Sequence, residues 1–317
     1  MTPFTHLHLH TDYSLLDGCG RIKDYVKKAK EYGMTSMAIT DHGVMFGVID
    51  FYKTCIANGI KPIIGCEFYI AEGDLDIKDE TNKKRNHLIL LAKDNTGYKN
   101  LIKMASIAYV DGFYIKPRID KKTLEKYHEG IVCLSACIAG EIPRLLLDGR
   151  FEEAEKAALW YKNLYGSENY YIEIQNHHID KELEVLPHLI ALARKLDIPL
   201  VATNDCHYVN KEDSEAQDVL MCIGMGKLVS DENRLKFSTD ELYFRSGDEM
   251  AELFKDIPEA IQNTKRIEEQ CSLTLSLPGP LPPHFKIEEG TTWDNGYLEK
   301  MNFVLKDPNK EEDRNKL

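Results

Sequence analysis

Three features that would assign this chain to a common class are missing from its sequence. No stretch approaches the roughly 20 apolar residues of a membrane-spanning helix, and the N-terminus lacks the apolar core of a secretory signal. The eight cysteines include no CxxC pair, so neither a zinc ribbon nor a disulfide framework is indicated. Positive charge is scarce as well, because 40 Lys and Arg oppose 52 Asp and Glu and leave a net charge of −12. We therefore expect a cytoplasmic protein with no membrane partner, reduced thiols and no broad basic surface for nucleic acid.

What the sequence does contain is a repeated unit of a strand followed by a helix. Short apolar runs predict seven strands, at 4–9, 36–40, 61–70, 87–93, 131–136, 170–175 and 198–204. Amphipathic stretches predict helices between them, at 21–32, 46–58, 98–109, 151–165 and 181–196. Such units predict an α/β fold with a mostly parallel sheet, and seven of them favour a TIM-like barrel over the alternative, an open doubly wound sheet.

The pattern changes after residue 210. The stretch 246–271 predicts two helices that break near Asp256 and Pro258. The segment 275–284 is rich in proline and predicts a linker, and the charged end of the chain predicts disorder. We therefore divide the chain into a barrel at 1–210, a helical extension packed on it at 211–274, and a linker with a partly disordered tail at 275–317.

The N-terminal stretch THLHLHTDYS places a histidine at every second residue. Side chains two apart on a strand share a face, so His6, His8 and His10 can approach one object, and a metal ion is the first candidate. A polar edge strand or a purification tag would explain the histidines alone. Their alternation with Leu7 and Leu9 is more typical of a strand that has one apolar face.

Further potential metal ligands lie near the ends of the other predicted strands. Carboxyl ends of strands in α/β enzymes meet at one rim, where sites are built. The candidates at this rim are His8, His10, Asp17, His42, Glu67, His87, Cys137, Asp205 and His207. One tetrahedral ion takes about four ligands, so nine predict two or three divalent ions, and zinc, manganese or iron would accept this set. We expect His6 to support a ligand or the fold, and the remaining histidines to lie in loops or on helix surfaces: His128, His177, His178, His188 and His284.

Several motifs resemble one known family when they are read in order. HLHLHT, YSLLDG, AITDHG, GCEFYI, CLSACIAGEI and TNDCHY are similar to the motifs of the polymerase and histidinol phosphatase (PHP) family of metal-dependent phosphoesterases. TDYSLLDG and DGFYIKPRID resemble most the PHP domain that opens the alpha subunit of bacterial DNA polymerase III. The resemblance implies a distorted (β/α)7 barrel with a centre of three metal ions.

The resemblance also implies a partition of the ligands. His8, His10, Glu67 and Asp205 would hold one ion, Asp17, His42 and His207 a second, and Glu67, His87 and Cys137 a third. The catalytic set would then be His8, His10, Asp17, His42, Glu67, Asp205 and His207. Three divalent ions against three carboxylates and one thiolate leave about +2 charges, which would attract a phosphate.

The expected activity is hydrolysis of phosphodiesters at DNA 3′ ends, as in a 3′→5′ exonuclease. The expected partners are the DNA 3′ end, the remainder of a polymerase and a proofreading subunit. Two basic runs, which could equally be solvated loops, supply candidate phosphate contacts at Lys83, Lys84, Arg85, Arg118 and Lys121. A small-molecule phosphomonoesterase of the histidinol phosphatase type and a non-catalytic, metal-braced scaffold are the alternatives. The chain ends before any polymerase palm motif, so we expect a truncated N-terminal portion without polymerase activity.

Overall fold

The computed structural model describes residues 2–277 and 279. The chain divides into two compact units, Met1–Leu275 and Ser276–Leu317, and all the helices and strands of the described residues lie in the first unit. Most of the predicted linker and tail, with His284, lies outside the described residues. A search of the described helices finds none with the length and apolar character needed to cross a membrane.

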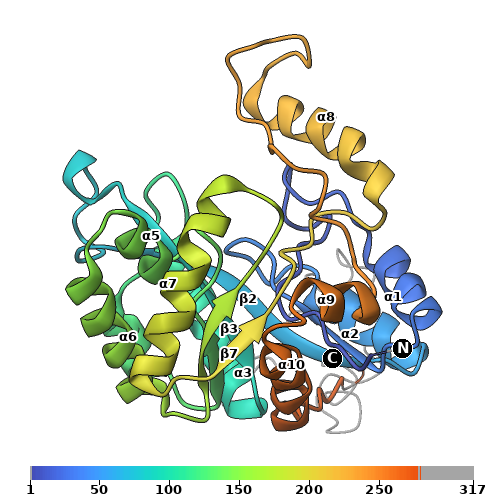
Figure 1. Ribbon diagram of the computed structural model, residues 1–317, viewed down its shortest axis with the longest axis horizontal. Helices are drawn as coiled ribbons and strands as arrows, with labels where there is room; N and C mark the ends of the chain where they lie inside the picture. Colours follow the sequence, from blue (N-terminus) through green and yellow to red (C-terminus); the bar gives the residue numbers. More distant parts are fainter. Residues whose placement is uncertain (1, 278, 280–317) are drawn as a thin grey trace, which may run out of the picture. The chain divides into compact units, whose positions relative to one another are not determined.

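One seven-stranded sheet forms the centre of the first unit (Figure 1). Its strands are β1 (Ser36–Ile39), β2 (Lys61–Ala71), β3 (Arg85–Ala92), β4 (Arg118–Ile119), β5 (Ile131–Leu134), β6 (Tyr170–Ile174) and β7 (Leu200–Ala202). They follow the order β1-β2-β3-β5-β6-β7, with the short β4 beside β2. The predicted α/β fold with a TIM-like sheet is confirmed, although β4 was not predicted.

The reversed direction of β3 corrects the expectation of uniform strand-helix units. β3 runs antiparallel to both β2 and β5, whereas all other strand pairs of the sheet are parallel. A parallel neighbour needs a crossover, usually a helix, but the connection 72–84 contains only a short 3-10 turn at Glu80–Asn82. The amino end of β3, with His87, therefore lies at the same rim as the carboxyl ends of its neighbours β2 and β5.

The predicted strand 4–9 is extended but is not a regular strand. The backbone N–H groups of Ala38 and Thr40 donate to the carbonyls of His6 and Leu9, and the Cys206 N–H donates to the carbonyl of His8. The segment therefore lies between β1 and the chain that follows β7, and it links the two ends of the sheet. Its ladder is interrupted because the N–H of Leu9 donates to the Thr40 hydroxyl instead of to a carbonyl.

The helices of this unit are α1 (Ile22–Glu31), α2 (Val48–Ala57), α3 (Asn95–Val110), α4 (Lys121–Tyr127), α5 (Glu141–Leu147), α6 (Phe151–Tyr165), α7 (Asp180–Leu196), α8 (Ser214–Met225), α9 (Gly247–Leu253) and α10 (Pro258–Gln270). Most of the helices lie against the sheet, whereas α8 stands apart from it (Figure 1). All the helices predicted from periodicity are present, including the break at Pro258. The short α4 and α5 and the helix α8 were not predicted one by one.

Strand side chains alternate between two apolar clusters, as the period of two requires. On β3, Leu88 and Leu90 pack toward the helices, whereas Ile89 and Leu91 belong to a cluster inside the curled sheet. Ile267 and Cys271, at the end of α10, complete the inner cluster. The division at residue 210 remains a prediction.

Candidate metal centre

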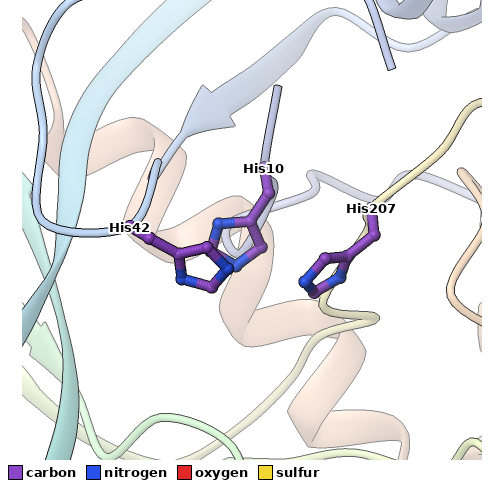
Figure 2. Close-up of side chains that lie close together, drawn as sticks. All are labelled: His10, His42 and His207. Carbon is purple, nitrogen blue, oxygen red and sulfur yellow. The ribbon is translucent and has the colours of Figure 1, made fainter. Parts of the chain in front are cut away.

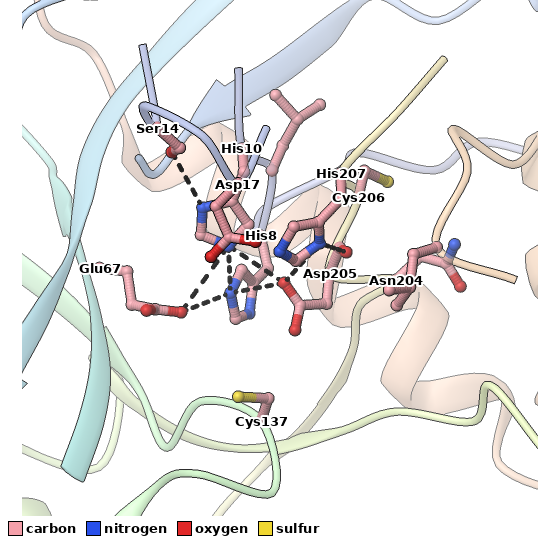
Figure 3. A network of polar contacts seen from close by, with 12 residues as sticks. His8, His10, Ser14, Asp17, Glu67, Cys137, Asn204, Asp205, Cys206 and His207 are labelled. Atoms are coloured by element: carbon pink, nitrogen blue, oxygen red, sulfur yellow. Dashed lines mark hydrogen bonds and ion pairs between the residues drawn. The ribbon is translucent and has the colours of Figure 1, made fainter. Parts of the chain in front are cut away.

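His8 and His10 meet two carboxylates inside the rim (Figure 3). Their Nε2 atoms lie 3.1 Å apart, and Asp205 Oδ1 lies 3.1 and 3.0 Å from them. Glu67 Oε2 is 3.0 Å from His8 Nε2. Two nitrogens around a tetrahedral zinc with 2.0–2.1 Å bonds are separated by about 3.3 Å, so the spacing suits one cation. Asp205 Oδ1 is buried and accepts no well-aligned hydrogen bond, as expected of an oxygen whose partner is a cation.

A second group brings together side chains from β2, from β3 and from the loop that follows β5. His87 Nδ1 lies 2.9 Å from Glu67 Oε1 and 3.7 Å from Cys137 Sγ. The loop of Cys137 is held there because the His87 N–H donates to the Ala139 carbonyl. These three residues are the set that the resemblance implies for one ion, and their ligand atoms all lie within 4.8 Å of one another.

The third group differs from the expected one. His10, His42 and His207 bring their ring nitrogens together, with His10 between the other two rings (Figure 2). The His10 and His42 rings stack at 3.8 Å. Asp17 lies at the edge of this group, with Oδ2 3.2 Å from His42 Nε2. His10 therefore belongs to two groups at once.

Glu67 connects the groups through its two oxygens. Oε2 faces the Nε2 atoms of His8, at 3.0 Å, and His10, at 3.7 Å. Oε1 faces the Nδ1 atoms of His42, at 2.7 Å, and His87, at 2.9 Å. A carboxylate in this position can bridge two cations.

The charges at the centre hold the two carboxylates ionised and His10 neutral, which are the states that metal ligands need. At His8 and His42 the neighbouring carboxylates outweigh burial and raise the pKa, so a cation must displace a proton from each of these two rings. Burial, together with the His42 and His207 rings, lowers the pKa of His10 to about 3. Burial opposes ionisation of Glu67 and Asp205, but the surrounding histidines outweigh it and hold both pKa values well below the ordinary range. Neutral imidazole and ionised carboxylate are the ligating forms.

The thiol of Cys137 behaves differently. Burial, with the nearby Asp205 and Glu67 charges, raises its pKa well above the ordinary value. A bound divalent cation deprotonates a coordinating thiol outright. The residues therefore fit a metal, and the full donor set of imidazole, carboxylate and thiolate suits zinc, manganese or iron.

Sequence reasoning missed the residues that orient these ligands. Glu173 on β6 is fully buried, and its Oε1 accepts a hydrogen bond from His8 Nδ1 at 2.7 Å. This bond places the His8 proton on Nδ1 and turns the Nε2 lone pair toward Asp205 and Glu67. The signal was present in the sequence, because a carboxylate inside an apolar strand must have a partner.

Two other histidines are structural. His6 Nε2–H donates to the Arg245 carbonyl, and its ring lies between those of Phe4 and Phe244; burial lowers its pKa to about 4. His177 lies in the loop between β6 and α7, as expected, but it is buried there, with Nδ1 2.8 Å from Glu182. Its Nε2 donates to the Asn204 carbonyl and so holds the residue before Asp205.

Arg118 is not a phosphate contact, which corrects the prediction. It is fully buried, and its guanidinium donates to the backbone carbonyls of Gly112, Asn82 and Ile77. The prediction counted the positive charges of the run IKPRIDKK but did not consider which face of a strand each side chain would take. In β4 the Arg118 side chain points into the protein.

The other four candidates remain accessible. Lys83 is exposed and pairs with Glu80. Lys84 and Lys121 line a cleft of about 1070 Å³ beside β3, α5 and α6, although Lys121 also pairs with Glu141 at 2.8 Å. Arg85 lies over the Tyr69 ring at 5.8 Å. Their contact with a phosphate stays a prediction.

The chain is similar to several known proteins. The chain is 50% identical over 301 residues to DNA polymerase III subunit alpha of Borreliella burgdorferi, and 51% identical over 300 residues to that of Treponema pallidum. Each match covers 94% of this chain and 26% of the relative, so the chain spans about a quarter of their length. An amidohydrolase structure from Chromobacterium violaceum is 12% identical, with a TM-score of 0.46, over 64% of this chain and 87% of that one. Residues 6–177, more than half of the chain, match the model of the PHP domain, and the chain therefore belongs to the PHP domain family.

Proposed function

We propose that this chain is the metal-dependent phosphoesterase domain of a DNA polymerase III alpha subunit, and that it hydrolyses phosphodiesters at DNA 3′ ends in the 3′→5′ direction. The observation that carries the proposal is the position of Glu67, whose two oxygens face two separate groups of imidazoles. A bridged set of ligands of this kind suits phosphoester hydrolysis by more than one ion. The relatives' names support the polymerase context.

Each side chain of the centre has a role that follows from its position. Divalent ions held here would supply charge for the phosphoryl oxygens and a water of lowered pKa. Asp205 and Glu67 fix the His8 and His10 nitrogens, and Glu173 holds the His8 proton on Nδ1. Cys137 and His87 would hold an ion on the side of Glu67 Oε1.

A substrate would reach the centre from the side of Asp17 and His87. Their side chains are 42% and 21% exposed, whereas those of His8 and Glu67 are at most 1% exposed. Three divalent ions against the three carboxylates and the Cys137 thiolate leave about +2 charges there. The opening can therefore attract a phosphate although the whole chain carries −12.

The test is release of nucleotides from a 3′-labelled oligonucleotide in manganese. The wild type should release them, a chelator should stop the release, and Asp205→Asn should abolish it because it removes a carboxylate charge from both His8 and His10. Asp197→Asn is the matched control, since Asp197 is exposed and has a left-handed backbone that asparagine tolerates. Equal release by wild type and Asp205→Asn would refute the assignment.

Two alternatives are outcomes of the same experiment. Hydrolysis of histidinol phosphate without release from DNA would indicate a small-molecule phosphomonoesterase. Metal binding without turnover of either substrate would indicate a scaffold that contacts the rest of the polymerase or a proofreading subunit.

A further inference from the structure

Three aromatic rings meet on the surface near the metal centre. Phe46, Tyr109 and Phe113 come from three segments, and their side chains lie in contact, with centroid distances of 6.4 and 6.2 Å. We name them the aromatic patch. The residues are 61%, 43% and 47% exposed, so burial in the fold does not explain their clustering. Grouped exposed apolar side chains mark binding surfaces.

Two cations lie at the Tyr69 ring, which packs against two of the candidate ligands. The Arg85 guanidinium and the Lys116 ammonium stand 5.8 and 5.7 Å from the centroid of the Tyr69 ring. That ring packs edge-on against His87 at 5.2 Å and nearly parallel to His42 at 6.5 Å. In the described part of the chain no carboxylate forms an ion pair with either cation. We name Arg85 and Lys116 the basic pair.

The loop that carries Phe113 and Lys116 is held firmly. Arg118 anchors its start through the Gly112 carbonyl, and a Cβ at Gly112 would lie 1.9 Å from the Arg118 oxygen. Ile115 has φ +65°, which is a strained conformation for a β-branched residue. Strain of this kind persists where the surroundings enforce it and is frequent at functional sites.

The two loops are also packed against each other. A Cβ on Gly43 would come within 2.9 Å of Pro117 and 3.1 Å of Tyr69, so the loop of His42 and Phe46 lies directly on the loop of Lys116. A continuous surface therefore leads from the metal ligands, past the basic pair, to the aromatic patch.

From this arrangement we propose that the surface binds the single DNA strand that precedes the scissile 3′ diester. Arg85 and Lys116 contact its phosphates, and the aromatic patch stacks on its bases. Sequence-tolerant binding of single strands combines a cationic path with aromatic rings in this way. A protein partner would account for the rings but not for two unpaired cations next to the metal ligands. The inference rests on the proposed function and specifies its substrate as single-stranded.

Binding is measured without turnover, by fluorescence anisotropy of a labelled phosphorothioate oligo(dT) with the 317-residue chain. Phe113→Ala should weaken binding by about 5- to 150-fold, the range for one base–aromatic stack, with the salt dependence unchanged. Lys116→Ala should weaken binding and reduce the slope of log affinity against log salt by about 0.7. Phe151→Ala and Lys23→Ala are matched controls on other surfaces and should bind like the wild type. A duplex of the same length should bind more weakly than the single strand.

Two results would overturn the inference. One is wild-type affinity in both Phe113→Ala and Phe46→Ala, which would show that the aromatic patch does not bind DNA. The other is an unchanged salt slope in Lys116→Ala. Hydrolysis of bis(4-nitrophenyl) phosphate, which is too small to reach the patch, reports separately on the metal centre. If this diester is not cleaved while the variants lose DNA affinity, the proposed function fails and the strand surface stands.

Discussion

Glu67 and Cys137 provide the sharpest test of how the centre shares its ligands. Glu67→Ala removes contacts to four imidazoles, two through each oxygen. Cys137→Ala removes one thiol from one group only, that of Glu67 and His87. We therefore expect the glutamate variant to disturb two ions and the cysteine variant one.

The size of the effect follows from linkage. A bound ion stabilises the folded state by about 2.7 kcal/mol when its free concentration is 100 times its dissociation constant. Loss of one site in Cys137→Ala should therefore remove about 3 kcal/mol of the stabilisation by metal, and loss of two sites in Glu67→Ala should remove about 5 kcal/mol. For a domain of this size each kcal/mol corresponds to about 2–4 °C in Tm.

The assay combines elemental analysis with thermal unfolding, each with zinc and with a chelator. Wild-type protein prepared without chelator should contain two to three ions per chain, and the rise of Tm on adding zinc should fall in the order wild type, Cys137→Ala, Glu67→Ala. Cys55→Ala is the control, because Cys55 is a buried residue of α2 itself and belongs to none of the three groups. Its rise of Tm with zinc should match that of the wild type even if its own Tm is lower. Equal metal loss in the two variants would refute the bridging role of Glu67, and one ion or fewer in the wild type would refute the multinuclear centre.

Three further predictions concern stability and orientation. Arg118→Ala should lower the free energy of unfolding in urea by about 2–5 kcal/mol, because three buried carbonyls lose their donor and a cavity is left. Lys122→Ala, which breaks only an exposed pair with Asp74, should have little effect, and a similar effect of both changes would contradict the anchoring role. Glu173→Ala should weaken zinc binding by about 10- to 100-fold in a competition titration, whereas the exposed Glu125→Ala should leave it at the wild-type value. Chelator-treated protein should be most stable between about pH 4 and pH 6.5. Burial lowers the pKa of His42 but Glu67 and Asp17 raise it to about 10, so its contribution is full below its ordinary value of 6.5 and is lost as the pH rises through about 10. Burial raises the pKa of Asp17 but His42 holds it at about 2, so its contribution is present above its ordinary value of 3.8 and is lost as the pH falls toward 2. With zinc added, the free energy of unfolding in urea should not fall between pH 7 and pH 9, since ligation needs neutral imidazole. A fall as large as that of the chelator-treated protein would contradict the site.

Periodicity was sufficient to predict where the ligands gather. Each apolar run was bounded by polar residues, and the rule that carboxyl ends share a rim brought together residues as distant as His8 and Asp205. The rule succeeded at His87 only because β3 is reversed. The sequence did not reveal that reversal, since a connection of this length can hold either a short crossover or a hairpin.

Side-chain direction explains where the sequence misled. Arg118, Glu173 and His177 are all buried polar groups whose partners come from distant segments. Composition gives the number of charged residues but not their hydrogen-bond partners. From the sequence alone, an arginine that donates to three buried carbonyls therefore cannot be told from one on the surface. The expected Asp17, His42 and His207 set stays a prediction, and the local spacing gave no sign that the His10 ring would also lie against His42.

The N-terminal histidines show why a regular strand could not form there. Successive same-face residues of a strand are about 6.5 Å apart, and their side chains stand nearly parallel. The Nε2 atoms of His8 and His10 lie 3.1 Å apart, so the two rings must converge. The chain achieves this by giving the Leu9 N–H to the Thr40 hydroxyl and leaving the ladder. The backbone is also left-handed at Leu16, Ala136 and Asp205, each of which is a candidate ligand or the neighbour of one. These local turns likewise help to direct side chains toward the centre. Three of the six non-glycine residues with left-handed backbone in the described part of the chain therefore lie where side chains must converge, as expected if the fold bears strain to hold a metal centre.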